Sequence, residues 1–249
     1  MDANKIAANW EELIGIIDVE FTGLRKTGLI NLYTTMQDEM MMAPASGYEH
    51  FHNAFPGGYV DHVLRVIRAV VKVNELWNEM GSLAEKVTRE ELIFTALNHD
   101  LGKAGTVDQP YYIPNNSEWH RKNQGKLYEV NPEITNMTVP HRGLWLLNQF
   151  GISYSESEMI AILTHDGMYD DSNSYYLKPY GDKKQLRNNL PIILHQADMI
   201  ASNIEYEIWK NDGSGIKPTV AKPSRQSKPE LSSASDDAKD IFANLFGEK

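Results

Sequence analysis

The sequence contains no cysteine among its 249 residues. Disulfide bonds and cysteine nucleophiles are therefore excluded. Any metal site must be built from histidine, aspartate and glutamate, and the chain has 8 histidines and 34 acidic residues to supply it. Such a ligand set suits Mn, Fe, Co, Ni, Zn or Mg, and several imidazoles in one site argue against a purely hard ion.

Long hydrophobic runs and excess positive charge are also missing. No run of about 18 apolar residues occurs and no signal-peptide pattern opens the chain, so we expect a cytoplasmic protein without membrane contact. Lysine and arginine number 24 against 34 acidic residues, which gives a formal net charge of −10. Long duplex nucleic acid is bound chiefly by basic side chains, so it is not an expected partner. A small anionic substrate drawn in by a bound cation is compatible with this charge.

Apolar residues recur at helical spacing up to about residue 210, which predicts one helical domain over residues 1–210. Two helices are expected within residues 1–45, and further helices over 60–77, 88–97, 140–150, 156–164 and from 190 onward. Residues 211–239 are rich in Gly, Ser, Pro and Lys, which predicts a flexible linker. Residues 240–249 regain helical spacing and would either dock on their own domain or insert into the groove of a protein partner.

The central stretch is Asn98-His99-Asp100-Leu101-Gly102-Lys103, at the end of an apolar helix. Thr88 and Glu91 form a predicted capping box at the start of that helix, and Gly102 is a natural stop. A buried helix that ends on an imidazole and a carboxylate needs partners for both groups, because an unpaired buried charge is costly. A metal ion is one such partner, and an ordinary hydrogen-bonded core pair is the alternative.

Similar candidates occur elsewhere in the chain, at or near helix ends or beside buried stripes: His62, His141, His165 and Asp198. Each of them alone has an ordinary explanation, such as a packed core histidine. Together with the central His-Asp pair they make six nitrogen and oxygen ligands, which is more than one catalytic ion needs. We therefore expect two divalent ions bridged by one carboxylate.

The segment from residue 104 to about 137 is polar, aromatic and rich in turn residues, and it predicts a long loop with a short hairpin about Asn123-Gln124-Gly125. A loop of this length in a domain is usually functional or disordered. Four of its side chains are expected to stack on or pair with a substrate: Trp119, His120, Arg121 and Tyr128. A plain surface hairpin is the competing interpretation.

The ordered set H…HD…H…H…D, with its centre spelled His99-Asp100-Leu101-Gly102-Lys103, resembles the HD-domain superfamily of metal-dependent phosphohydrolases. Residues 55–62 (Phe-Pro-Gly-Gly-Tyr-Val-Asp-His) are also similar to the start of the HD domain in bacterial 3′-to-5′ exoribonucleases. The resemblance covers residues 46–210. It implies an all-α bundle, here with a small hairpin or loop insertion and a flexible C-terminal tail. It also implies that a metal-activated water cleaves a phosphoester of a nucleotide or small nucleotide-like substrate.

The resemblance further implies a role for each ligand. The first ion would be held by His62, His99, Asp100 and Asp198, and Asp100 would bridge to a second ion held by His141 and His165. Fe or Mn is the expected metal. Lys103 would act in catalysis by neutralising a phosphate oxygen or by helping the leaving group, and Arg142 and Arg121 would contact the phosphate.

Two more residues are expected behind the ligands. His195 lies three residues before Asp198 on the same predicted helix, where it would orient that ligand or simply pack. Asp166 stands where the cyclic-dinucleotide branch of the superfamily has a second histidine, so cyclic di-GMP is not the expected substrate.

Two other functions fit the same residues. The first is a di-iron oxygenase. The set of four histidines and two aspartates, with the lysine after His-Asp-Leu-Gly, also resembles that of inositol oxygenases and related phosphonate-cleaving di-iron oxygenases. The second alternative is a binding or adaptor protein, in which residues 240–249 carry the function and the helical core is a scaffold.

Overall fold

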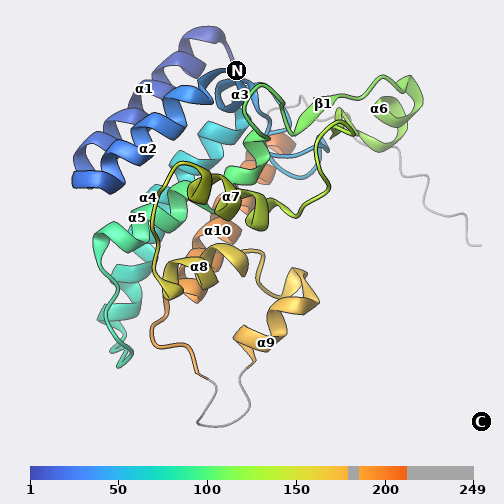
Figure 1. Cartoon of the computed structure of the whole chain (residues 1–249). Coiled ribbons are helices and arrows are strands. Elements are labelled where there is room, and N and C mark those ends of the chain that lie inside the picture. Colours follow the sequence, from blue (N-terminus) through green and yellow to red (C-terminus); the bar gives the residue numbers. More distant parts are fainter. Residues whose placement is uncertain (179–184, 212–249) are drawn as a thin grey trace, which may run out of the picture. The chain divides into compact units, whose positions relative to one another are not determined.

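The computed structural model describes residues 1–178 and 185–211, and these are predominantly helical (Figure 1). The all-α expectation is confirmed. The helices in order are α1 (Ala3–Glu20), α2 (Gly23–Thr35), α3 (Gln37–Met42), α4 (Gly58–Glu79), α5 (Arg89–Asn98), α6 (Glu118–Gln124), α7 (Val139–Gln149), α8 (Glu156–Leu163), α9 (Ser174–Leu177) and α10 (Leu190–Asn211), with short 3₁₀ turns η1 (Leu101–Ala104), η2 (Gly167–Tyr169) and η3 (Asp171–Asn173). No helix in the described part of the chain has the length and apolar character needed to cross a membrane.

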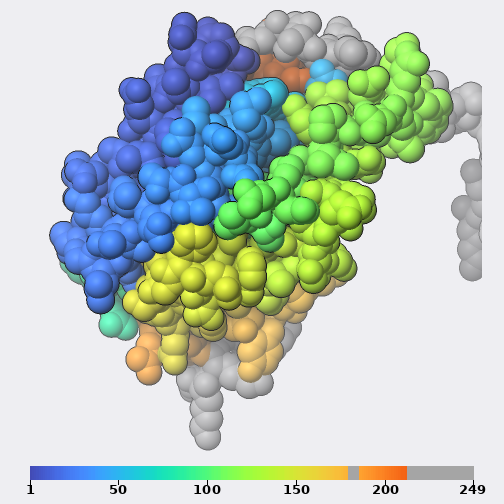
Figure 2. Space-filling view, turned by 45° about the horizontal axis from the view of Figure 1, so that its top comes forward, coloured from blue at the N-terminus to red at the C-terminus, as the bar shows by residue number. Residues whose placement is uncertain are grey.

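The first three helices pack against one side of the domain core. The sequence predicts two helices before Pro44, whereas the structure has three, because the chain breaks helical geometry at Met36 between α2 and α3. Leu13 and Ile17 of α1 and Leu29 and Leu32 of α2 are completely buried against α4 and its neighbours. Figure 2 shows these helices as the blue surface beside the yellow α7 and α8 region.

The centre of the domain is the pair of long helices α4 and α10, with α5 packed on α4 and α8 packed on α10. On α4 the residues Val60, Val63, Ile67 and Val70 recur at helical spacing and are at most 5% exposed. Leu194, Ala197 and Ala201 make the matching buried stripe of α10. Burial of this amphipathic face is what stabilises such helices in a protein. The same packing brings the ends of α5 and α8 to the α4–α10 pair.

The segment between α5 and α7 carries a two-stranded antiparallel sheet, β1 (Tyr112–Pro114) with β2 (Tyr128–Val130), in which Tyr112 pairs with Val130. The predicted hairpin turn at 123–125 is wrong, because helix α6 occupies residues 118–124 between the strands. Ser117 caps this helix by accepting a hydrogen bond from His120 N, and Gly125 ends it in the left-handed conformation. This insertion is the green lobe that projects from the helical domain in Figure 2.

The capping box that starts α5 is confirmed, since Thr88 and Glu91 make both reciprocal hydrogen bonds. The end of the helix differs from expectation. The α-helical part stops at Asn98, and Gly102 lies within η1 rather than in a left-handed cap. A Cβ at Gly102 would stand 2.1 Å from the carbonyl oxygen of Val139, so the glycine is required for close packing of η1 on α7. The predicted linker comprised residues 211–239, but Asn211 is the last residue of α10. The rest of that segment and the predicted terminal helix, residues 240–249, lie outside the described residues.

Candidate metal centre

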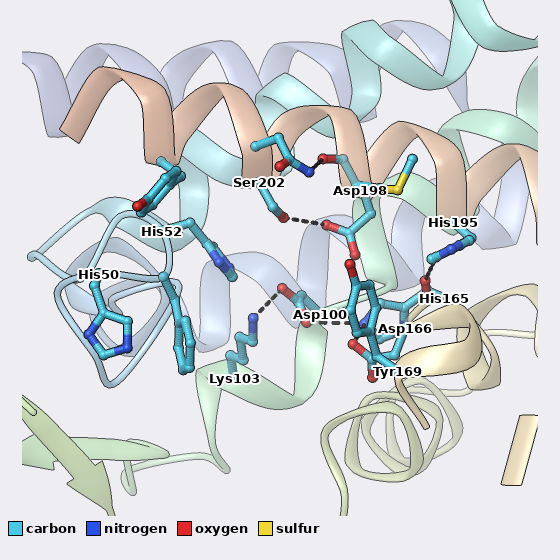
Figure 3. Close-up of a pocket in the computed structure, with 14 residues that line it drawn as sticks. His50, His52, Asp100, Lys103, His165, Asp166, Tyr169, His195, Asp198 and Ser202 are labelled. Atoms are coloured by element: carbon cyan, nitrogen blue, oxygen red, sulfur yellow. Dashed lines mark hydrogen bonds and ion pairs between the residues drawn. The ribbon is translucent and has the colours of Figure 1, made fainter. Parts of the chain in front are cut away.

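Five side chains from four segments meet at the α4–α10 pair. They are His62 of α4, His99 and Asp100 after α5, His165 after α8 and Asp198 of α10. The first four of these residues are at most 2% exposed, and the Asp198 side chain is 17% exposed. Figure 3 shows Asp100, His165 and Asp198 facing one another at the floor of a cavity. The structure thus brings together five of the six predicted ligands.

The three imidazoles present the same nitrogen to the cluster. His62 Nδ1 donates to Glu205 at 3.1 Å, His99 Nδ1 to the Ala96 carbonyl at 2.8 Å, and His165 Nδ1 to the Ile162 carbonyl at 2.8 Å. Because each Nδ1 carries the hydrogen, each neutral ring has an unprotonated Nε2 that points inward. This arrangement of the outer nitrogen is the one usually found in metal-ligating histidines.

The spacing of the inward atoms fits a metal ion. His62 Nε2 and His99 Nε2 are 3.3 Å apart. Two nitrogens bound to one ion at about 2.1 Å stand roughly 3.0–3.4 Å apart for angles between a right angle and a tetrahedral one. Asp198 Oδ1 lies 3.1 Å from His62 Nε2, and Asp100 Oδ2 lies 3.5 Å from His99 Nε2. The buried His and Asp groups therefore have the geometry to hold a metal ion.

The two oxygens of Asp100 face different partners. Its Oδ2 points to His99 and also lies 3.7 Å from His62 Nε2, whereas its Oδ1 lies 3.5 Å from His165 Nε2. A carboxylate turned in this way is suited to contact two ion positions. The number of ions, and the bridging role expected for Asp100, stay predictions.

The charges of the cluster are strongly coupled. Burial alone would lower the pKa of His62, but the adjacent carboxylates of Glu205 and Asp198 raise it to about 10. Burial also opposes charge on His165, but its hydrogen bond with Asp100 and the charge of Asp166 raise its pKa to about 9. At His99 burial dominates and lowers the pKa to about 4. Without a metal, protons on two of the histidines thus balance the carboxylates, and a bound cation would replace those protons.

Lys103 is the cation closest to the cluster. Its Nζ lies 2.6 Å from Asp100 Oδ2, and its side chain is 13% exposed. Burial would lower the pKa of Lys103, but the Asp100 carboxylate outweighs burial and raises that pKa above its ordinary value. Conversely, burial would raise the pKa of Asp100, but the charges of Lys103 and His99 hold it well below its usual range. The ammonium group is therefore a fixed positive charge at the edge of the cluster.

A cavity of about 530 Å³ opens directly above these groups. Asp100, Lys103, His165 and Asp198 line its floor. Its other walls carry aromatic and small polar side chains, namely His50, Phe51, His52, Tyr169, Tyr206, Ser202 and Asn203. The volume is in the range of sites for small organic ligands.

The two residues expected behind the ligands both line this cavity. His195 was expected to orient Asp198. Instead its Nδ1 donates a hydrogen bond to the backbone carbonyl of His165 at 2.8 Å. Asp198 is instead bonded by Ser202 Oγ at 3.2 Å. The Asp166 carboxylate is 56% exposed and lies 3.7 Å from His165 Nε2.

The structure does not bring His141, the sixth predicted ligand, to the cluster. His141 is exposed on the first turn of α7, where its Nδ1 lies 2.6 Å from Thr138 Oγ1. Arg142 beside it is buried, but its guanidinium donates to the Thr135 carbonyl and lies over the Tyr111 ring, away from the cavity above the cluster. The expected ligand set of the second ion is therefore incomplete in this structure.

The predicted substrate contacts of the insertion lie elsewhere as well. Trp119, His120 and Arg121 are on α6 and do not line the cavity above the cluster, and the Trp119 side chain is 60% exposed. Tyr128 lines a second cavity, of about 420 Å³, on the other side of Lys103. Trp119, His120 and Arg121 belong to helix α6, which occupies the part of the chain that was expected to form a hairpin turn.

One residue of the site, Glu205, was missed from the sequence. Glu205 of α10 is 2% exposed and accepts hydrogen bonds from both His62 and Arg65. It lies seven residues after Asp198, which puts both carboxylates on one face of the helix, and that spacing was a readable signal. His50 and His52, which the sequence offers as candidates for the mouth of a pocket, both line the cavity from the loop before α4.

Comparison of the chain with protein-family models, with curated proteins and with solved structures finds no match in any of the three. The function of the site has to be argued from its own residues.

Proposed function

We propose that this protein is a metal-dependent phosphohydrolase that cleaves a phosphoester of a nucleotide or similar small molecule. The observation that carries the proposal is the meeting of five nitrogen and oxygen donors, four of them buried, beside a cavity of about 530 Å³ whose floor is formed by three of them, Asp100, His165 and Asp198. Buried donors of this kind are costly unless they bind something, and an open cavity above them leaves coordination positions accessible to a substrate.

In this proposal the donors would serve two ion positions. His62, His99, Asp100 and Asp198 would hold the first ion. Asp100 Oδ1 and His165 Nε2 face a second position, which has fewer protein ligands because His141 lies outside the cluster. When bound, divalent ions would supply positive charge that lowers the pKa of a water and attracts phosphoryl oxygens. Fe or Mn suits the mixed imidazole and carboxylate donors.

The surrounding side chains support binding of a phosphoester. The Lys103 ammonium faces the cavity and would neutralise a phosphoryl oxygen or the oxygen of the leaving group. Ser202 and Asn203 of α10 add hydroxyl and amide groups to the same wall. The aromatic rings of Phe51, Tyr169 and Tyr206 stand at the cavity from three different segments. Rings in this position suit stacking on a planar base, which favours a nucleotide over a small inorganic phosphate ester.

The decisive experiment is an anaerobic screen of the full chain loaded with Mn²⁺ or Fe²⁺. Phosphate release is measured from nucleoside mono-, di- and triphosphates and from p-nitrophenyl phosphate. We expect release from at least one nucleotide and at least a hundredfold loss in the Asp100→Asn variant. The matched control is Glu118→Gln, an exposed acidic residue of α6 paired with Lys122, which should retain full activity.

Two results would contradict the proposal. One is bound metal without phosphate release from any compound of the panel. The other is oxygen consumption by the Fe²⁺ form with no phosphate release, which would favour the di-iron oxygenase alternative.

A further inference from the structure

His52 is a histidine of the cavity that no part of the metal centre uses. It lies in the loop between α3 and α4, with its ring centroid 4.9 Å from that of His62. Its Nε2 is buried and has no hydrogen-bond partner among the described residues. Figure 3 shows the ring reaching down from the loop toward the side of the cavity where Lys103 and Asp100 lie. Buried polar atoms are normally paired, so an exception of this kind calls for an explanation.

The loop that carries His52 is held in a fixed conformation. The next residue, Asn53, has a φ of 41°, in the left-handed region that costs energy for a residue other than glycine. Its side-chain amide donates to Asp61 Oδ2 at 3.1 Å, and Asn9 donates to the other oxygen of Asp61 at 3.2 Å. A Cβ at Gly58 would stand 2.0 Å from the Asn53 carbonyl oxygen, so α4 packs directly on this turn. The unpaired nitrogen of His52 is therefore not the result of a loose loop.

The position of His52 distinguishes it from the ligands. The close groups of donor atoms that can hold an ion contain His62, His99, His165 and the two aspartates but not His52. His52 lines the same cavity as Lys103, Asp100 and Asp198. A group bound there between the metal position and Lys103 would have an oxygen within the reach of an N–H donor. Anionic oxygens accept such hydrogen bonds strongly.

We propose that His52 is a substrate-contacting residue whose Nε2–H donates a hydrogen bond to a phosphoryl oxygen of the ligand held above the metal centre. This inference rests on the proposed function for its ligand class, a phosphate group. It adds to that function an uncharged donor in the same cavity as Lys103. The strained Asn53 turn and its contacts with Asp61 are positioning elements that keep this donor in place.

The test measures binding of inorganic phosphate to the full chain loaded with Mn²⁺, by calorimetry, together with the bound metal content. In His52→Leu, phosphate affinity should fall about tenfold, because one hydrogen bond to a charged group is lost. In His52→Gln, whose amide nitrogen lies near the place of Nε2, affinity should stay within about threefold of the parent. Metal content should be unchanged in both variants. The melting temperature of metal-free His52→Leu should equal or exceed that of the parent, because a buried unpaired polar group has been removed.

Each other outcome overturns the inference. Parent-like phosphate affinity in His52→Leu would mean that the nitrogen makes no contact with the anion. Loss of bound metal in both variants would make His52 a metal ligand instead. Equal loss of phosphate affinity in the Leu and Gln variants would indicate a role of ring shape rather than of hydrogen bonding. The proposed function fails by a separate measurement, namely phosphate binding by the metal-loaded parent without turnover of any ester.

Discussion

Glu205 offers the sharpest test of how the metal centre is built. It is a buried carboxylate that contacts no metal position, yet it accepts the Nδ1–H of His62 at 3.1 Å and the Nε–H of Arg65 at 3.1 Å. The Glu205→Gln substitution removes the negative charge but leaves an oxygen that can accept from His62. It therefore changes the basicity of a ligand without changing the ligand.

Two quantities should change, namely the affinity for metal and the unfolding free energy of the metal-free protein. Removal of the partner of a metal-ligating histidine typically costs 10–100-fold in metal affinity, which is about 1.4–2.7 kcal/mol. In the metal-free protein, loss of one partner of a buried ion pair costs about 3–5 kcal/mol. For the unfolding free energy we expect the lower end of that range, a loss of about 3 kcal/mol. The glutamine oxygen keeps one hydrogen bond, and the Arg65 side chain is 31% exposed and can turn to water. The pKa of His62 should also fall, since Glu205 provides the largest contribution that raises it.

The assay is competition for Mn²⁺ or Zn²⁺ against a fluorescent chelator, combined with denaturant unfolding of the metal-free protein. Glu207→Gln is the matched control, because Glu207 lies on the same helix but is exposed. It should change neither quantity measurably. A folded Glu205→Gln protein with parental metal affinity would refute the view that His62 is a ligand tuned by Glu205.

The remaining predictions concern pH, charge, packing and the sixth ligand. The folded pKa of His62, about 10, lies above its ordinary value of about 6.5, so its stabilisation of the metal-free protein is complete below about pH 6.5 and is lost as the pH rises toward 10. The melting temperature of chelator-treated protein should therefore fall between pH 7 and 10, and a constant value would contradict the assigned pairing. Lys103→Met should lower kcat/KM for a phosphoester about 10–100-fold without loss of metal, whereas equal activity would remove Lys103 from the mechanism. Gly102→Ala should destabilise the protein by about 3 kcal/mol in denaturant unfolding, because its Cβ meets backbone, whereas Gly15→Ala in α1 meets nothing and should be neutral or stabilising. His141→Ala should leave metal content by elemental analysis unchanged, and loss of one equivalent would show that His141 moves into the site when metal binds.

Local signals in the sequence were sufficient to predict the helices that frame the site. The capping box at Thr88–Glu91 is present, because it depends only on residues three apart. Helical spacing likewise identified the buried stripes of α4 and α10. The same kind of signal failed at Asn123-Gln124-Gly125, since a glycine after polar residues ends a short helix as readily as it forms a hairpin turn.

Contacts between helices were beyond the reach of those signals. His141 looked like the other candidate ligands because it stands in the first turn of a helix. Its exposure depends on how α7 is rotated against η1, and that rotation is set by close packing at Gly102. The spacing of Glu205 from Asp198 places it on the same face of α10, but the spacing does not say what lies opposite that face. It is buried because α4 places His62 and Arg65 opposite it. The exposure of His141 and the burial of Glu205 both depend on residues that are far away in the sequence.

The repeated His-Asp ending shows the same limit within one motif. His99 and His165 each follow a helix and donate Nδ1–H to the carbonyl three residues earlier, one of the helix-end carbonyls that lack a partner. The helix end thus fixes the tautomer and direction of both rings, and this much is a local property of the sequence. The following aspartates differ, because Asp100 is 2% exposed beside Lys103, whereas the Asp166 side chain is 56% exposed. An identical pair of residues therefore supplies a histidine donor twice but a buried carboxylate only once, and the difference lies in what each helix end packs against.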